Sequence, residues 1–304
     1  MMRYRDIVIH TNSGIFGREE ELKASPPIQQ WVELSECMSL GRLEQGLAKA
    51  IMDTCEPKAL GISPQFRQYA QLYSFVHELS GDVDIHRWDH DNELTAVIGL
   101  SRLVHPTAVG FAYAARVGYE SEGMKEIFPA QIIGVSKEAF LSPSRTRDWL
   151  TYAEAHVLRD LVTSLKQEQP RRVHNALWHH EYATRTYYLD HRWTLVCTGL
   201  EALVHTDSTR NTAQFTKRVP ALAFELGVNI SEPEAAAAYD LRSRLAHGVS
   251  LIAAKTSHGP SPAQLHLYDR LEDTLRTAIL RSMQDKSFAD IFRDDDQIRK
   301  RWPI

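Results

Sequence analysis

The sequence lacks the features that mark several large classes of protein. Its 304 residues include only three cysteines, Cys37, Cys55 and Cys197, which are too few and too widely spaced for a disulfide framework or a zinc ribbon. No run of apolar residues approaches the length of a membrane span, and the first ten residues carry charges where a signal peptide needs an apolar core. These absences predict a cytoplasmic protein that makes no membrane contact.

Neither sign of charge is in large excess. Lys and Arg together number 35 and Asp and Glu 39, which leaves a formal net charge of −4. A protein that coats nucleic acid over its whole surface would be strongly basic, so any contact with nucleic acid is expected to be local. The chain also has no glycine-rich phosphate loop and no Ser-His-Asp ordering, so ATP hydrolysis and acyl transfer have no support. Its length and 43% hydrophobic content predict a globular chain of two domains.

The first half of the chain mixes two hydrophobic periods. Apolar residues occupy the odd positions from Val109 to Val117, bounded by Pro106 and Gly118, while Arg116 falls on the alternate face; this is typical of a half-buried strand. The other periodic segments are two weaker strand candidates, residues 5–10 and 127–134, and two helix candidates, residues 40–55 and 66–79. We expect residues 1–145 to form a mixed α and β N-terminal domain that serves sensing or partner binding.

The second half is helical by its period, with apolar residues every three or four positions along four stretches. The stripes are Ala155, Leu158, Val162 and Leu165; Leu189, Trp193, Val196, Leu200 and Leu203; Phe215, Val219, Leu222 and Leu226; and Leu267, Leu271, Leu275 and Ala278. Gly227 is suited to follow a helix end, and Ser231 with Glu234 forms a capping box that opens the next helix. With a boundary expected in segment 141–147, which holds proline and serines, residues 146–304 are expected to form a helical bundle followed by a charged tail without a stripe.

The most informative segment is YDLRSRLAHG, residues 239–248. In it Arg242 is followed at once by the polar residue Ser243 and, five positions after Arg242, by His247. This combination resembles the active motif of the HEPN superfamily of helical bundles, many of whose members are enzymes that cleave RNA without a metal.

Residues around and upstream of this motif are similar to the Apea-like HEPN family in the expected order. They are Leu241, Leu245 and Gly248; Arg192 and Trp193; Gly199, Leu200, Glu201, Ala202 and Leu203; and Gln214, Phe215 and Arg218. The stretch 100–117 also resembles the segment that precedes the bundle in that family, so the resemblance covers about residues 100–280. It implies an all-α HEPN bundle after an α+β N-terminal domain, a homodimer with the motif at its interface, and an RNA substrate, with no cofactor and no metal. It further implies a part in defence against phage or in toxin-like growth arrest, through cutting transfer RNA or another RNA, with a protein regulator.

The chemistry of the motif side chains fits RNA cleavage. A phosphodiester is cut when its own 2′-hydroxyl attacks phosphorus, provided that one group moves protons and another neutralises the charge on the phosphoryl oxygens. An imidazole titrates near neutral pH, so His247 is the candidate general acid or base. Arg242 stays charged and offers a planar fork to phosphate, Ser243 is suited to orient the phosphate or Arg242, and Arg244 is suited to a second phosphate contact.

Helix geometry requires something to bring the two main groups together. Five residues at about 100° each place Arg242 and His247 roughly 140° apart around one straight helix. Gly248 is suited to the C′ position, which would put His247 at the frayed helix end, where the negative end of the helix dipole favours its protonated form. A two-fold axis, alone or in addition, would set the Arg242 and His247 of one subunit against those of another.

A different class of function stays open. Arg242 could be an ordinary surface arginine paired with Asp240 or Glu201, and a histidine before a C-capping glycine is a common helix ending. The protein would then be a noncatalytic dimeric HEPN module that binds a nucleotide, an RNA or a partner protein.

Three weaker patterns have simpler explanations than a second site. Segment 178–181, WHHE, suggests a metal site, but adjacent histidines on a helix point about 100° apart, so solvated or RNA-facing side chains are favoured. Residues 84–91 hold three aspartates and two histidines, for which a polar loop is favoured over a metal site. The candidate base-stacking rings are Trp178, Tyr182, Tyr187 and Tyr188. Trp193 lies in an apolar stripe and is expected in the core.

Overall fold

The computed structural model describes residues 3–11, 30–54, 74–79, 93–106, 110–120, 123–129, 150–165, 167–186, 188–248 and 260–304. The chain divides into two compact units, Met1–Thr163 and Ser164–Ile304. The first unit contains strands and helices, whereas the second contains only helices in the part that is described. Segment 141–147, where the sequence predicts a domain boundary, lies outside the described residues.

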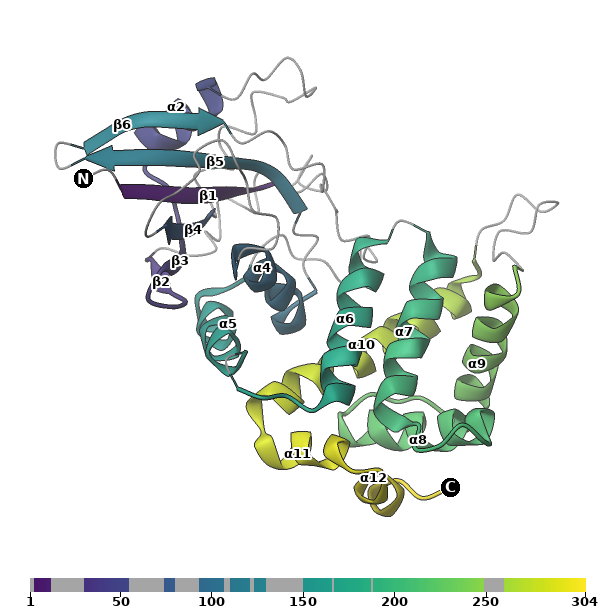
Figure 1. Ribbon diagram of the computed structural model, residues 1–304. Helices are drawn as coiled ribbons and strands as arrows, with labels where there is room; N and C mark the ends of the chain where they lie inside the picture. The colour runs from purple at the N-terminus through teal and green to yellow at the C-terminus, as the bar shows by residue number, and fades with distance from the viewer. Residues whose placement is uncertain are drawn as a thin grey trace. The chain divides into compact units, whose positions relative to one another are not determined.

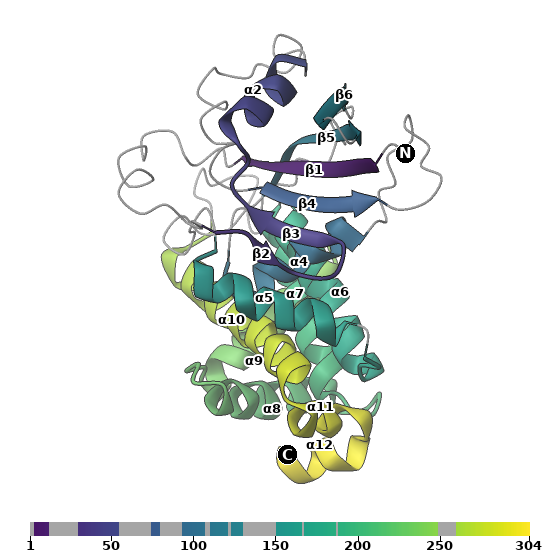
Figure 2. The same cartoon turned by 90° about the vertical axis from the view of Figure 1, so that its left-hand side faces the viewer.

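The first unit is built on one six-stranded antiparallel sheet in the order β2-β3-β4-β1-β5-β6, which Figure 2 shows from β6 to β2. The strands are β1 (Arg3–Thr11), β2 (Val32–Glu33), β3 (Met38–Gly41), β4 (Ser74–Leu79), β5 (Gly110–Glu120) and β6 (Gly123–Pro129). The helices of this unit are α2 (Gln45–Thr54), α4 (Glu93–Val104) and α5 (Tyr152–Ser164). Ile7 of β1 is in register with Val76 of β4 and Ala115 of β5, and all three side chains are buried, so the core of the sheet lies here.

The structure confirms the expected strands at residues 5–10 and in the described part of 109–117, which form β1 and β5. The strand expected at 127–134 is found only as the end of β6, and residues 130–134 lie outside the described residues. Arg116 is 5% exposed, so the prediction of a half-buried β5 is wrong at this position. β5 is an inner strand between β1 and β6, and an inner strand can bury both faces.

The two helix predictions in the first half need correction. The described part of segment 66–79 is the strand β4, not a helix, because Phe75 and its neighbours lie inside the sheet between β3 and β1. Segment 40–55 begins in β3, where Leu40 is fully buried, and becomes helical only at Gln45. A short apolar run is compatible with the period of a helix and with that of a strand. In both segments, pairing with neighbouring strands produced strand structure.

The second unit is a bundle of helices (Figure 1). They are α6 (Arg171–Arg185), α7 (Leu189–Val204), α8 (Asn211–Glu225), α9 (Glu232–Ala246), α10 (Pro262–Gln284), α11 (Lys286–Asp290), η3 (Ile291–Arg293) and α12 (Asp295–Arg301). The expected apolar stripes, the first of which lies on α5 of the first unit, are buried, except that Leu165 is exposed and Leu189 and Leu226 are half-buried. Trp193 is 1% exposed, which confirms its place in the core, and its Nε1 donates to the Ala238 carbonyl at 3.1 Å.

The charged tail expected after α10 is instead part of the core. Phe288, Phe292, Ile298 and Trp302 are buried, and they come from α11, η3, α12 and the residue that follows α12. Because the apolar residues are shared among short helices, they form no continuous stripe in the sequence. No helix among those described is long and apolar enough to cross a membrane.

Buried polar groups join helices that are far apart in the sequence. His180 Nε2 of α6 lies 2.8 Å from Glu272 Oε1 of α10, and each side chain is 1% exposed. Arg218 of α8 donates from Nη1 to the Val204 carbonyl at 2.7 Å and from Nε to the Trp302 carbonyl at 2.9 Å. These contacts fix α6, α7 and α8, the helices around the candidate site.

Candidate functional site

The motif segment forms the C-terminal half of α9 and the turn that ends it. The Ser231 backbone N–H and hydroxyl both donate to Glu234 Oε2, at 2.9 and 2.7 Å, which confirms the expected cap at the start of the helix. His247 is the C-cap residue, and Gly248 follows with a φ of 85°, a left-handed conformation that favours glycine. The structure thus confirms that Gly248 terminates α9 and that His247 stands at its end.

Arg242 is held against α7. Its Nη2 donates to Glu201 Oε2 at 2.8 Å, and its guanidinium carbon lies 5.9 Å from the centre of the Tyr239 ring. The side chain is 27% exposed, while its Nε atom is buried and has no hydrogen-bond partner among the described groups. Arg242 is therefore an oriented guanidinium, and the pairing with Glu201 that the sequence left open is present.

The other motif side chains are more accessible. Ser243 is half-buried and His247 is exposed, whereas Arg244 is exposed and pairs with Asp240 at 3.1 Å. α9 is continuous from Arg242 to Ala246, so helical geometry keeps Arg242 and His247 on different faces. Within one chain the structure does not bring the guanidinium and the imidazole together.

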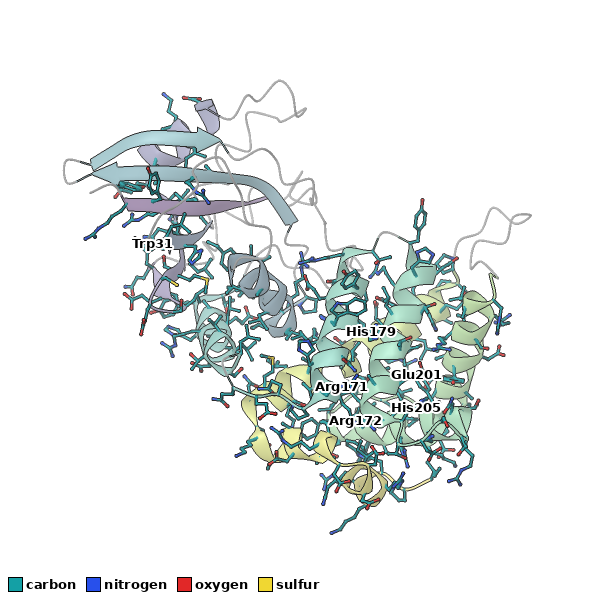
Figure 3. The ribbon with its side chains drawn as sticks, in the orientation of Figure 1. Trp31, Arg171, Arg172, His179, Glu201 and His205 are labelled. Carbon is teal, nitrogen blue, oxygen red and sulfur yellow. The ribbon has the colours of Figure 1, made fainter. Side chains whose placement is uncertain are left out.

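A pocket of about 1010 Å³ opens between α6 and α7 of the same unit. Its charged and imidazole side chains are Arg171, Arg172, His174, His179, Glu201, His205, Glu168 and Arg293. Figure 3 shows Arg171, Arg172 and His179 on α6 beside Glu201 on the neighbouring α7 and His205, the residue that follows α7. Since Glu201 lines the pocket and also binds Arg242, one carboxylate connects the pocket to the motif helix.

His205 lies in this pocket close to several guanidinium groups. Burial and then the guanidinium groups of Arg218, Arg242 and Arg172 lower the pKa of His205 to about 4, so the ring is neutral at pH 7. The His205 Nε2 atom is buried and has no partner among the described groups. Burial raises the pKa of the Glu201 carboxyl, and Arg242 opposes that rise. Arg172 donates to the Ala202 carbonyl at 2.9 Å and also binds Asp295.

Among the described residues, those of the WHHE segment included, no group of three or more His, Cys, Asp or Glu side chains is placed to hold a metal ion. The expectation that the WHHE histidines are solvated is wrong for His180, which points into the core and binds Glu272. His179 is half-buried at the pocket, and burial lowers its pKa. Residues 84–91 lie outside the described residues.

Three of the candidate stacking rings are exposed. Trp178 is 49%, Tyr182 47% and Tyr188 61% exposed, and Tyr187 lies outside the described residues. The Trp178 and Tyr182 rings lie one turn apart on α6, with centroids 4.2 Å apart and an interplanar angle of 33°. They form a pair of partly stacked aromatic rings at the surface.

No protein-family model, curated protein or solved structure matches this chain. The resemblance to Apea-like HEPN proteins therefore rests on the motif residues themselves. Several upstream residues that carry it have structural roles, because Trp193, Gln214 and Arg218 are buried and hydrogen-bonded. The pocket residues Arg171, Arg172 and His205 were not found from the sequence, since their only signal was the density of histidine and arginine in this region.

Proposed function

We propose that this protein is a metal-independent endoribonuclease of the HEPN type that acts as a homodimer through its second unit. The observation that carries the proposal is the end of α9, where an exposed His247 stands on a turn closed by Gly248, one and a half turns after an oriented Arg242. A general acid or base needs access to substrate, and His247 has it. A two-fold axis that pairs two α9 ends places Arg242 and His247 of different subunits beside one phosphodiester.

Each side chain has one task in the reaction. The RNA 2′-hydroxyl gives up its proton as its oxygen forms a bond to phosphorus, the bond from phosphorus to the 5′-oxygen breaks, and that leaving oxygen takes up a proton. His247 moves the proton as general acid or base, and Arg242 neutralises the charge on the phosphoryl oxygens. Ser243 orients the phosphate or Arg242, and Arg244 makes a second phosphate contact after it leaves Asp240. The products are a 2′,3′-cyclic phosphate and a 5′-hydroxyl.

The test is cleavage of purified total RNA in the presence of a chelator. The wild-type protein is expected to cut and to leave cyclic phosphate ends, while His247→Ala loses about a hundredfold or more of the rate, the usual contribution of a general acid or base. His266→Ala removes an exposed imidazole from α10 and serves as the matched control. Activity that the chelator abolishes and His247→Ala retains would contradict the proposal and direct attention to residues 84–91.

A noncatalytic module is the second candidate, and the ion pair between Arg242 and Glu201 favours it. A guanidinium already bound to a carboxylate has fewer donors for a phosphate. The protein would then use the bundle to dimerise and to bind a nucleotide, an RNA or a partner protein. If the wild-type protein binds RNA but cuts none of several RNA pools, this function replaces the first.

A role in defence or growth arrest follows from the same proposal. A nuclease that cuts transfer RNA or other cellular RNA harms its own cell, so it needs control. The mixed α and β first unit is a candidate for sensing a trigger or for binding a protein regulator. Cell growth after induced expression, compared between wild type and His247→Ala, tests this role: equal growth would contradict it.

A further inference from the structure

The exposed face of α6 combines a guanidinium and an imidazole with two aromatic rings. Arg171, His174, Trp178 and Tyr182 are all exposed and recur at steps of three and four residues. At about 100° per residue they fall within about 80° of one another around the helix axis. The opposite face buries Val173, Ala176, His180, Ala183 and Thr184 in the core. We call these four exposed residues the α6 stripe.

We propose that the α6 stripe binds single-stranded RNA, with bases stacked on Trp178 and Tyr182 and phosphates bound at Arg171 and in the adjoining pocket. This inference rests on the proposed ribonuclease function and names unpaired RNA as its substrate class. It concerns a binding surface outside the motif of α9.

The aromatic pair supplies the stacking surface. The Trp178 and Tyr182 rings lie against each other at 4.2 Å, so a base stacks on an outer ring face and continues an existing stack. Both side chains are about half exposed, at 49% and 47%, so both rings are accessible to a ligand. Every nucleobase has a flat face, so two stacked rings bind unpaired RNA with little dependence on sequence.

The charge of α6 distinguishes RNA from other partners. The helix carries three arginines and three histidines but a single carboxylate, Glu181, which is paired with Arg185 at 2.5 Å. Arg171 has no ion-pair partner among the residues that the structure describes, and it lines the pocket together with His174. Arg172 and Arg185 are paired with Asp295 and Glu181, so the guanidinium open to a phosphate is that of Arg171, at one end of the stripe.

The dimensions also fit a short unpaired segment. Eleven residues separate Arg171 from Tyr182, which is about 16 Å along a helix axis. Stacked nucleotides advance about 3.4 Å each, so the stripe matches four to five nucleotides. A base-paired duplex presents its phosphates outward and keeps its base faces covered, so it cannot use the two rings.

The test measures binding separately from cleavage. Fluorescence anisotropy of a labelled unpaired oligoribonucleotide is recorded with full-length His247→Ala protein, so that the RNA stays intact. Adding Trp178→Ala and Tyr182→Ala together is expected to weaken binding at least about tenfold, because each stacked ring contributes about a fivefold to hundredfold effect. Phe224→Ala removes an 85% exposed ring from α8 and is the matched control that leaves binding unchanged. Trp178→Phe keeps a flat ring and retains most of the affinity.

The salt dependence of RNA binding distinguishes the contribution of Arg171 from that of the two rings. Arg171→Ala is expected to reduce the slope of log affinity against log salt by about 0.7, the value for one lost phosphate contact on a single strand. The ring variants lower the affinity without changing that slope. Lys300→Ala, which removes an exposed cation from α12, is the charge-matched control.

Three results would overturn the inference. The first is unchanged RNA binding after loss of both rings, and the second is an equal loss of RNA affinity with Phe224→Ala. The third is a ring variant with an altered oligomeric state and unaltered RNA binding, which would make the stripe a protein interface. Its failure is distinguishable from that of the proposed function. If wild-type protein cuts RNA and the ring variants cut with the same KM, the proposed RNA binding by the α6 stripe is wrong and the proposed ribonuclease function is supported. If the rings are required for binding and no RNA is cut, RNA binding by the α6 stripe is supported and the proposed ribonuclease function is wrong.

Discussion

Replacing His205 by glutamine is expected to remove part of the acid sensitivity of the second unit. Burial, followed by Arg218, Arg242 and Arg172, lowers the pKa of His205 from 6.5 to about 4 in the folded protein. Unfolding exposes the ring, so between these two pH values the unfolded state binds a proton that the folded state does not. The free energy of unfolding therefore falls as the pH falls through this window. The loss of stability caused by His205 is absent above pH 6.5, where the ring is neutral in both states.

The size of the effect follows from the shift of the pKa. Each pKa unit corresponds to about 1.4 kcal/mol, so lowering the pH from 6.5 to about 5 costs at most about 2 kcal/mol through this ring. Part of the His205 side chain is accessible to solvent, and screening reduces the expected cost to about 1 kcal/mol. Two neighbours also titrate: the lowered pKa of His179 acts in the same direction, and the raised pKa of Glu201 acts in the opposite one.

The readout is therefore the difference between wild type and variant. Urea unfolding is followed at about pH 7 and about pH 5 by hydrogen exchange of α7 and α8 amides, which localises the transition to the second unit. His205→Gln is expected to lose about 1 kcal/mol less than wild type between the two pH values, and His266→Gln, at an exposed ring of α10, to behave as wild type. NMR titration of the His205 ring gives its pKa directly. A value near 6.5, or identical pH dependence in variant and wild type, would refute the reasoning.

Three other substitutions test the packing of the second unit through the free energy of unfolding. Glu272→Ala is expected to cost about 3 to 5 kcal/mol because it leaves His180 buried without its partner, while Glu272→Gln keeps the hydrogen bond and costs less; equal losses would contradict the buried pair. Gly199→Val is expected to cost about 1 to 3 kcal/mol because even a Cβ atom there would lie 2.7 Å from Leu275 Cδ2, and a stable variant would show that α6, α7 and α10 are less tightly packed. Gly248→Ala is expected to cost about 1 kcal/mol because its φ of 85° is strained for alanine, and Gly248→Asn less; no difference among the three would argue against the left-handed turn.

The helices of the second unit were predictable because their signals are local. Leu200, Phe215 and Leu271 belong to stripes that a single helix defines by itself, and all three are fully buried. The end of α9 was predictable for the same reason, since Gly248 carries the signal in its own backbone freedom. The arrangement of the sheet was not predictable, because residues 74–79 became a strand through pairing with β1 and β3.

The candidate site depends on contacts between distant positions, which the sequence of one chain does not reveal. His180 and Glu272 are 92 positions apart, and Arg242 and Glu201 are 41 positions apart. His180 looks like a surface histidine until its partner in α10 is known. For Arg242 the sequence left two carboxylates open, and only the packing of α9 on α7 selected Glu201.

The hydrogen bond from Arg218 to the Trp302 carbonyl ties the packing of α8 to a residue 84 positions later in the chain. The motif in α9 leaves the ribosome more than fifty residues before Trp302 does, yet the guanidinium of Arg218 has its full set of acceptors only when residue 302 has docked. Nascent chains that stop within α10 or α11 would carry every motif residue, but the Arg218 Nε donor would lack its acceptor while Nη1 keeps the Val204 carbonyl. Such fragments should be short-lived in the cell, which would couple any activity of α9 to complete translation of the second unit.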